Sequence, residues 1–553
     1  MSNEFTHDEL VEILRLKLQD HVGSRRIAKM YGRGKTTIND FLSRKTYKQF
    51  WEEYDKRPVA GGVVAHPESK RGSFNGTRFV FTSAQNNTYV HDKFLKSLEQ
   101  YCLHNNSQLV VGTFHYNKSG FQNGADKEIW YDPKIRGYIC DDPMQIANKL
   151  VWCGELNILP TAKTPLSGLY NYTADNSAIV PHAKVQLESV PTPKFDDPKL
   201  MYTTGAVTQM NYVQMKAGQI AEWHHIFGAL AVEIDEDGDW FVRQLIAESD
   251  TGEFYDLGEK YTPSGVSCNH RIEAINYGDI HAAKLDDVVA ETSWRAQNSI
   301  LDTLKPKYQF IHDVLDQQAR NHHNIRDPHF MFRMFNNQTE SVKDEVILTA
   351  NVIKETVRDF SQTVVVESNH DLALTKWLKE QDYRYDPVNA VFFLEMQLAS
   401  YKAIEQGGSL ASFEYACKNY CDGLDSVNFL GTDESFRIGT GIECGSHGHN
   451  GNNGSRGSMQ TYLKLGIKHN LGHVHGAAIR DGVYYAGVSG ELDMKYNMGG
   501  GSWNHSHIIT YQNSKRAIIT LKNGKWKAQL KKKIITASTN PRTVVNLKGL
   551  ENL

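Results

Sequence analysis

The sequence has no long hydrophobic run. Its 553 residues contain no apolar stretch close to the roughly 20 residues that a helix needs to cross a bilayer, so we expect no transmembrane segment. The first residues, MSNEFTHDELVEIL, are acidic and amphipathic, unlike the basic and then apolar start of a secretory signal peptide. Both absences favour a protein of the cytoplasm.

Paired cysteines and a strong net charge are also lacking. The seven cysteines form no Cys-x-x-Cys pair, which argues against a disulfide framework and favours reduced thiols. The formal net charge is only −3, so the chain as a whole has no strong electrostatic preference. Any affinity for nucleic acid must therefore come from local patches.

Histidine, in contrast, is abundant. The 23 histidines gather in a few places along the chain, which is the first indication of metal chemistry. A chain of this length is expected to form about three or four domains. The organisation of those domains decides where the histidines can meet.

Residues 1–58 are predicted to form a helical domain. The stretch GSRRIAKMYGRGKTTINDFLSRK contains a short helix, a glycine turn and a second helix. This pattern resembles a helix-turn-helix, whose second helix enters the major groove of DNA. A plain helical hairpin with a solvated basic face is the alternative. If the segment binds DNA, the contacts are expected from Arg33, Lys35, Thr36, Thr37, Asn39 and Arg44.

Residues 59–78, rich in Gly, Pro and charge, predict a linker, and residues 79–270 predict an α/β middle domain. The apolar stretches RFVFTSAQN and SQLVVGTFHYN are expected to be strands on either side of a helix at 93–102, which makes a βαβ-like unit. The role of the middle domain stays open between a specificity domain, an oligomerisation platform and a partner surface.

The C-terminal residues 515–553 form a basic segment. Between Lys515 and Leu550 there are ten Lys or Arg residues and no Asp or Glu. Two interpretations are equally supported: a contact with nucleic acid, or a solvated and partly ordered tail.

Residues 271–514 alternate short apolar strands with helices, which predicts an α/β core. Polar residues follow the strands, and ligands of such sheets bind at the carboxyl ends of the strands. Alternate residues of an extended strand end point to one side, so Asp279 with His281, and His473 with His475, can each converge on one ion. Carboxylate, imidazole and amide groups together suit a divalent ion such as Mn²⁺, Fe²⁺ or Zn²⁺.

The order of these motifs resembles the five-block signature of the calcineurin-like metallophosphoesterases. The blocks are D-x-H at 279–281, H-D at 312–313, N-H-D at 369–371, H-G-H at 447–449 and G-H-x-H at 472–475. They span about residues 271–510. The resemblance implies an α/β fold class: a metallophosphoesterase-type β-sandwich flanked by helices, here with the N-terminal helix-turn-helix and the α/β middle domain added.

The resemblance also implies a centre with two divalent ions, Mn²⁺ first, with Mg²⁺, Fe²⁺ or Zn²⁺ as alternatives. The first ion would be held by Asp279, His281 and His475, and the second by Asn369, His447 and His473, with Asp313 bridging both. His370 would protonate the leaving oxygen, and Asp371 would orient the imidazole of His370.

Further residues are candidates for contacts with the substrate. They are His323, His449 and Arg456, the last because a guanidinium fork suits a phosphate. The chain departs from the family pattern at His312 and Ser368, where the family usually has glycine. Both residues add bulk near the site, and neither replaces a metal ligand, so we expect activity to survive.

The flanking segments favour a polymeric substrate, so we expect a DNA phosphodiesterase similar to the double-strand-break-repair nucleases of this superfamily. Over its length the chain is also similar to the pre-early DNA-transfer proteins of T-five-like coliphages. This similarity implies degradation of host DNA during infection, a role in phage DNA transfer, the host bacterial cytoplasm as location, a homo-oligomer, and possible phage or host protein partners. A nucleotide phosphomonoesterase and a non-catalytic DNA-binding host-takeover regulator stay open as alternatives.

Overall fold

The computed structural model describes residues 5–18, 24–43, 45–51, 72–116, 129–194 and 196–529. The chain divides into two compact units, residues 1–69 and 70–553. In the described part of the chain, no helix combines the length and apolarity needed to span a membrane. The predicted DNA contact Arg44, most of the predicted linker and the lysine run at 531–533 lie outside the described residues.

The described part of the first unit includes the helices α1 (His7–Leu18), α2 (Ser24–Met30) and α3 (Lys35–Leu42), and residues 48–51 are also helical. They enclose a small core in which Ile13, Ile27 and Phe41 are buried. The turn between α2 and α3 uses Gly32 at φ +62°, a left-handed conformation that costs glycine little. Of the residues expected to contact DNA, four side chains are exposed and a fifth, Arg33, is half-buried; the exposed ones are Lys35, Thr36, Thr37 and Asn39.

The second unit begins with a four-stranded sheet in the order β10-β9-β2-β3. Strands β2 and β3 are parallel and are joined through helix α5, which confirms the predicted βαβ unit. The elements of the βαβ unit are β2 (Arg78–Gln85), α5 (Asp92–Asn105) and β3 (Gln108–Phe114), and the other two strands of the sheet are β9 (Gly228–Ile234) and β10 (Trp240–Ile246). A small three-stranded sheet follows, made of β11 (Phe254–Asp256), β12 (Glu259–Thr262) and β13 (Gly265–Ser267).

An eleven-stranded sheet joins segments that are far apart in the sequence. Its order is β1-β4-β5-β6-β8-β7-β21-β22-β20-β19-β18. The strands are β1 (Gly72–Ser73), β4 (Pro143–Ala147), β5 (Leu150–Cys153), β6 (Ser177–Val180), β7 (Leu187–Val190), β8 (Lys199–Thr203), β18 (Arg437–Ile438), β19 (Ile442–Glu443), β20 (Lys468–Leu471), β21 (Ala478–Arg480) and β22 (Val483–Tyr485). The segments predicted as a middle and a catalytic domain therefore share one sheet, where Leu187 pairs with Ile479.

A six-stranded sheet in the order β17-β16-β15-β14-β23-β24 carries the first three of the five predicted motifs, and the other two follow β19 and β20 of the eleven-stranded sheet. Its strands are β14 (Ala274–Asn276), β15 (Tyr308–His312), β16 (Gln362–Val366), β17 (Asn428–Leu430), β23 (Ser506–Thr510) and β24 (Arg516–Thr520). Strands β14 to β17 are parallel, and His312, Val366 and Leu430 are aligned at their ends. Because these strands end together, the residues that follow them meet at one edge. β24 lies within the segment predicted to be a basic tail, and most of its residues are buried.

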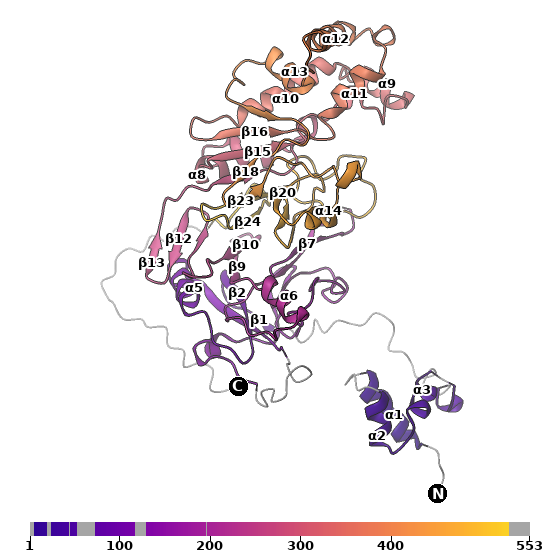
Figure 1. Cartoon of the computed structure of the whole chain (residues 1–553), viewed down its shortest axis with the longest axis vertical. Coiled ribbons are helices and arrows are strands. Elements are labelled where there is room, and N and C mark those ends of the chain that lie inside the picture. Colours follow the sequence, from indigo (N-terminus) through magenta and orange to yellow (C-terminus); the bar gives the residue numbers. More distant parts are fainter. Residues whose placement is uncertain are drawn as a thin grey trace. The chain divides into compact units, whose positions relative to one another are not determined.

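Helices cover the six-stranded sheet on the side of β15 and β16 (Figure 1). The main ones are α10 (Val342–Glu355), α11 (Leu372–Glu380), α12 (Ala390–Glu405) and α13 (Ser412–Tyr420). The other described α-helices of the second unit are α6 (Lys216–His224), α7 (Asp287–Ala290), α8 (Ile300–Leu304), α9 (Pro328–Asn336) and α14 (Met459–Lys464).

Strand β16 and helix α10 show how local sequence sets these elements. In β16, Val364 to Val366 are all buried, as expected for an inner parallel strand covered on both faces. Helix α10 begins where the hydroxyl oxygen of Ser341 accepts a hydrogen bond from the backbone N–H of Asp344. Its apolar residues then recur at helical spacing and pack into the core.

Candidate metal centre

The predicted ligands come together at the edge where the parallel strands end. Asp279 follows β14, Asp313 follows β15 directly and Asn369 lies just after β16. The loops after β19 and β20 add His447, His473 and His475. Asp279, His281, Asp313, His447 and His475 are all buried, so their charges and lone pairs interact through the protein rather than through water.

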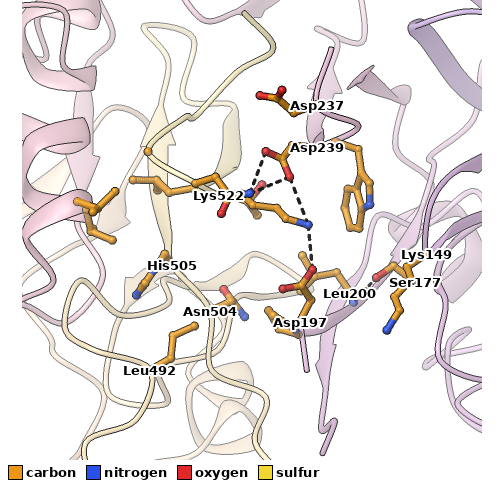
Figure 2. A pocket seen from close by; sticks show the side chains of 18 of the residues that line it. Lys149, Ser177, Asp197, Leu200, Asp237, Asp239, Leu492, Asn504, His505 and Lys522 are labelled. Carbon is orange, nitrogen blue, oxygen red and sulfur yellow. Dashed lines mark hydrogen bonds and ion pairs between the residues drawn. The ribbon is translucent and has the colours of Figure 1, made fainter. Parts of the chain in front are cut away.

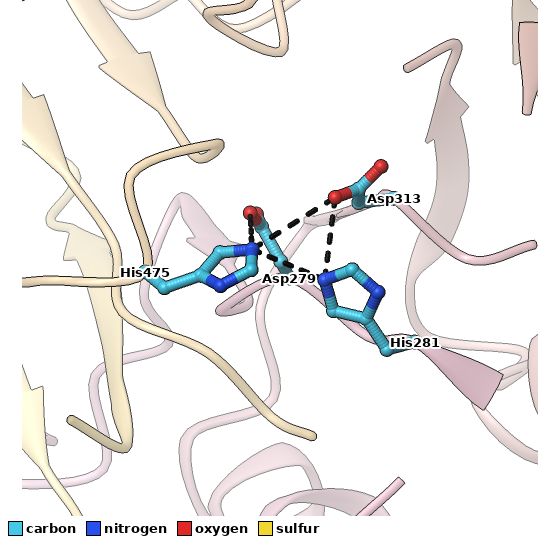
Figure 3. Close-up of side chains that lie close together, drawn as sticks. All are labelled: Asp279, His281, Asp313 and His475. Atoms are coloured by element: carbon cyan, nitrogen blue, oxygen red, sulfur yellow. Dashed lines mark hydrogen bonds and ion pairs between the residues drawn. The ribbon is translucent and has the colours of Figure 1, made fainter. Parts of the chain in front are cut away.

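Four donor atoms form a compact group (Figure 3). His475 Nε2 lies 3.0 Å from Asp279 Oδ2 and 3.1 Å from His281 Nε2. Asp313 Oδ2 lies 3.3 Å from His281 Nε2 and 3.9 Å from His475 Nε2. Ligands that bind one ion at about 2.0–2.2 Å are separated by distances of this order. The group is the set that the sequence assigned to the first ion.

The second predicted set lies beside the first. His447 Nε2 is 3.7 Å from Asp313 Oδ2, and the ring of His473 lies 5.2 Å from the ring of His447. Asp313 is thus placed between the two sets, as a bridging carboxylate must be. The amide oxygen of Asn369, just after β16, is buried and has no hydrogen-bond partner among the described residues.

Unpartnered polar atoms indicate that these residues fit metal ions. Among the described residues, Asp313 Oδ1, Asn369 Oδ1 and His447 Nε2 are buried without a hydrogen bond. A buried polar atom left in this way costs about 1–3 kcal/mol, so the cluster is unfavourable unless a cation completes it. Carboxylate, amide and imidazole donors are the set that Mn²⁺, Fe²⁺ and Zn²⁺ accept.

The backbone of the site is strained. His281, Asp313, His473 and His475 all have positive φ, between 50° and 74°. Each such residue costs of order 1–3 kcal/mol, and conformations of this kind concentrate at functional sites. These backbone conformations turn the side chains at the strand ends toward one point.

The electrostatics of the site reflect this crowding. Burial lowers the pKa of His281, but the carboxylates of Asp316 and Asp313 outweigh burial and raise that pKa to about 10. For Asp313, burial acts to raise the pKa, yet the charges of His370 and His447 bring it well below its ordinary value. Without an ion, a proton on His281 therefore balances the carboxylates, and a bound cation would replace that proton.

Three residues outside the predicted ligand set support it. Asp316 Oδ1 accepts a hydrogen bond from His281 Nδ1 at 2.7 Å, which leaves Nε2 to face the ion. His312 Nδ1 lies 2.9 Å from His447 Nδ1 and 3.0 Å from Asp279 Oδ1. A Cβ at Gly472 would collide with His312 and Asp279, so glycine is required there. Only the spacing of the HDVLD stretch could have indicated Asp316 from the sequence.

The two predicted catalytic residues, His370 and Asp371, do not form the expected hydrogen-bonded pair. The ring of His370 lies 5.2 Å from the ring of His281, and His370 is partly exposed. Asp371, expected to orient His370, has another role: Oδ1 accepts a hydrogen bond from the Leu315 N–H, and Oδ2 accepts two from Ser368. Asp371 faces the strand-end backbone because it begins helix α11, so it braces the two loops instead.

Of the predicted substrate residues, His449 lies in contact with this cluster. His449 packs between its neighbours, with its ring 5.5 Å from that of His447 and 6.2 Å from that of His473. Arg456 is exposed, and its charge adds to the effect of burial in lowering the pKa of His473. His323 is exposed on the loop before α9, and its ring centroid lies 3.9 Å from that of His322, with the two rings tilted by 40°.

A separate cavity of about 500 Å³ is lined by no predicted metal ligand (Figure 2). Its charges are paired: Lys522 Nζ lies 2.9 Å from Asp197 Oδ2 and 3.6 Å from Asp239 Oδ1. Nearby, the three aspartates of the turn between β9 and β10 lie 2.5–3.1 Å from the ammonium of Lys525. This ammonium occupies the position that a metal ion would take among the three carboxylates. These groups therefore lack the unpartnered donors of the histidine cluster.

Comparison with known proteins shows the family to which the chain belongs. No protein-family model and no solved structure matches the chain. Protein A1 of Escherichia phage T5 is 46% identical over 483 residues, which cover 85% of this chain and 86% of the relative. The chain belongs to the protein A1 family. Membership in the A1 family confirms the predicted similarity to proteins of T-five-like phages, and the metallophosphoesterase assignment stays a prediction.

Proposed function

We propose that the chain is a metal-dependent phosphodiesterase that cleaves DNA, with two divalent ions at the carboxyl edge of the six-stranded sheet. The observation that carries this proposal is the buried group of Asp279, His281, Asp313 and His475, whose donor atoms all lie within 4.8 Å of one another. Mn²⁺ is the favoured ion, and Mg²⁺, Fe²⁺ and Zn²⁺ are alternatives with similar ligand preferences.

The two ligand sets would each hold a divalent ion, and such ions would supply Lewis-acid activation of a phosphate ester and of a water molecule at neutral pH. In this proposal, Asp313 keeps the two ligand sets at a fixed separation. His370 donates a proton to the leaving oxygen: it is partly exposed beside the first set, and its Nδ1 has no partner among the described residues. Asp371 supports it indirectly by holding the loops after β15 and β16 together.

Two finer assignments belong to this proposal. A metallophosphoesterase-type β-sandwich is supported by a shared core between the two large sheets, where Phe310 and Val364 of one meet Ile438 and Ile442 of the other. A DNA-binding helix-turn-helix is supported by α2, α3 and the exposed polar side chains that open α3.

We also propose that the substrate is host DNA during phage infection, that the protein aids phage DNA transfer, and that it acts as a homo-oligomer. The phage origin of the A1 relative supports the first two parts.

A direct test compares plasmid DNA with a chromogenic phosphate monoester, each incubated with Mn²⁺, Mg²⁺ or EDTA. We expect nicking or degradation of the plasmid that needs the divalent ion. His370→Ala should lower the cleavage rate by about 100-fold or more, the usual contribution of a positioned general acid. The matched control is His104→Ala, which changes a histidine on helix α5, the helix that joins β2 and β3 of the four-stranded sheet. This variant should leave the rate unchanged.

The alternatives give different results in the same assay. Turnover of the monoester with intact plasmid would favour a nucleotide phosphomonoesterase. Loss of all hydrolysis, with DNA binding retained, would favour a non-catalytic regulator.

A further inference from the structure

Helix α9 is apolar and yet buries no residue. Phe332 and Phe335 are 67% and 64% exposed, and their ring centroids lie 6.4 Å apart. Exposed aromatic pairs of this kind on a helix of nine residues are uncommon in a soluble protein and mark binding surfaces. The face of α9 that carries these two rings is called the α9 face below.

The α9 face is attached firmly to the rest of the unit. The Asp327 side chain caps the helix by accepting hydrogen bonds from the N–H groups of His329 and Phe330. On the chain before it, the buried guanidinium of Arg320 forms a two-point ion pair with Asp386, at 2.6 and 2.8 Å. The exposed rings therefore sit on a segment whose base is fixed.

The loop that leads into α9 lies close to the candidate metal centre. Asp316, the partner of His281, is separated from α9 by only a short 3-10 turn and this loop. The segment that leads to α9 therefore begins beside the site, at the carboxylate that orients His281.

The chemistry of the surface indicates the kind of partner. Between 321 and 339 the chain has Arg326 and Arg333 but a single carboxylate, and that carboxylate, Asp327, is engaged in the helix cap. Aromatic rings placed among cationic groups are how proteins bind single-stranded nucleic acid: the cations attract the phosphates, and the rings stack on the bases. A duplex offers no free base faces, so the rings would be unused with paired DNA.

We propose that the α9 face is a stacking platform for unpaired bases of the DNA strand whose phosphate enters the metal centre. The preferred substrate is then single-stranded DNA or a frayed end, rather than intact duplex. This inference rests on the proposed DNase function for its substrate, but the binding step can be tested without cleavage.

The test uses the full chain and a variant with Phe332→Ser and Phe335→Ser. Because α9 buries neither ring, this variant should fold normally. The matched control is Leu398→Ser with Tyr401→Ser on α12, which removes side chains that are 56% and 67% exposed. Binding is measured in EDTA by the fluorescence of 2-aminopurine in a single-stranded oligonucleotide and in a blunt duplex of the same sequence. Hydrolysis of bis(p-nitrophenyl) phosphate is measured separately with Mn²⁺.

The wild type and the α12 control should bind the single strand more tightly than the duplex and quench 2-aminopurine by stacking. The α9 variant should lose the quenching and bind the single strand at least about tenfold more weakly, since each base–aromatic stack contributes a factor of roughly 5 to 150. Its turnover of the small ester should be unchanged.

Three results would overturn the inference. They are an unaltered single-strand affinity in the α9 variant, an equal loss of affinity for the duplex, or a fall in its molar mass by light scattering with DNA binding intact. The last result would assign the α9 face to a second copy of the chain. Failure of the wild type to hydrolyse any phosphodiester would reject the proposed function, while the fluorescence result would still decide the role of α9.

Discussion

At the residue scale, the ligands depend on partners that hold them in one orientation. Asp316 binds His281 Nδ1 at 2.7 Å and also accepts the N–H of Ala283. We expect Asp316→Ala to weaken metal binding by about 10- to 100-fold, because the His281 ring loses the acceptor that directs Nε2 to the ion. Titration with Mn²⁺, followed by electron paramagnetic resonance of the free ion, measures this change.

A second carboxylate provides the control for Asp316. Asp302 pairs with Arg358 at 3.0 Å and has no contact with a ligand residue among its described bonds. Asp302→Ala should leave Mn²⁺ affinity unchanged. Equal affinities of the wild type and Asp316→Ala would show that Asp316 does not position His281.

At the scale of elements, helix α10 is tied to the turn that follows Asp316. The carboxylate of Glu345 accepts hydrogen bonds from the N–H groups of Gln318 and Ala319, at 2.6 and 3.0 Å. Burial, with a smaller effect of the Asp316 charge, raises the pKa of Glu345 from 4.5 to about 7. The folded protein therefore holds this proton more tightly than the unfolded chain does.

The sign of the pH effect follows from that difference. The contribution of Glu345 to the free energy of unfolding is complete below pH 4.5 and declines as the pH rises to about 7. A shift of this size corresponds to about 3 kcal/mol. Urea unfolding in EDTA should show the wild type losing about 3 kcal/mol more than Glu345→Gln over this range. Glu405→Gln, an exposed change on α12, should follow the wild type, and parallel curves for all three proteins would contradict the prediction.

At the scale of the whole molecule, the chain consists of two units, residues 1–69 and 70–553. We expect deletion of residues 1–69 to leave the thermal midpoint of the second unit and its turnover of a small ester unchanged. DNA affinity should fall, and its dependence on salt should become shallower, because phosphate contacts from α3 are lost. Fluorescence anisotropy of labelled DNA at several salt concentrations measures both quantities.

A point variant separates binding by α3 from other effects of the deletion. Lys35→Glu places a negative charge at the exposed start of α3 and should weaken DNA binding in the full chain in the same direction as the deletion. Undiminished DNA affinity of the truncated protein would exclude a role of the first unit in binding.

Local elements were predictable because their signals are local. Two apolar runs around a helix predicted the βαβ unit of β2 and β3, and the buried valines of β16 and the serine cap and helical spacing of α10 are local signals of the same kind. The ordered motifs also named the residues that meet at the metal centre, since residues that follow parallel strands must share an edge.

Contacts between distant side chains were not predictable in the same way. Nothing in the spacing indicated that Asp371 would bind Leu315 and Ser368 in place of His370, or that His312 would join Asp279 to His447. Such partners depend on the angles at which strands end and loops turn. A motif does not fix these angles, because the same motif can occur with many different flanking sequences.

The sequence by itself thus determined the candidate ligand residues and the strands that precede them, because apolar periodicity and motif order are properties of short stretches of chain. Only the tertiary structure decided that the segments before and after residue 270 share an eleven-stranded sheet, and which carboxylates orient the histidines. Strand pairing such as that of Leu187 with Ile479 is a long-range competition among many similar partners, and packing of the complete unit selects the outcome.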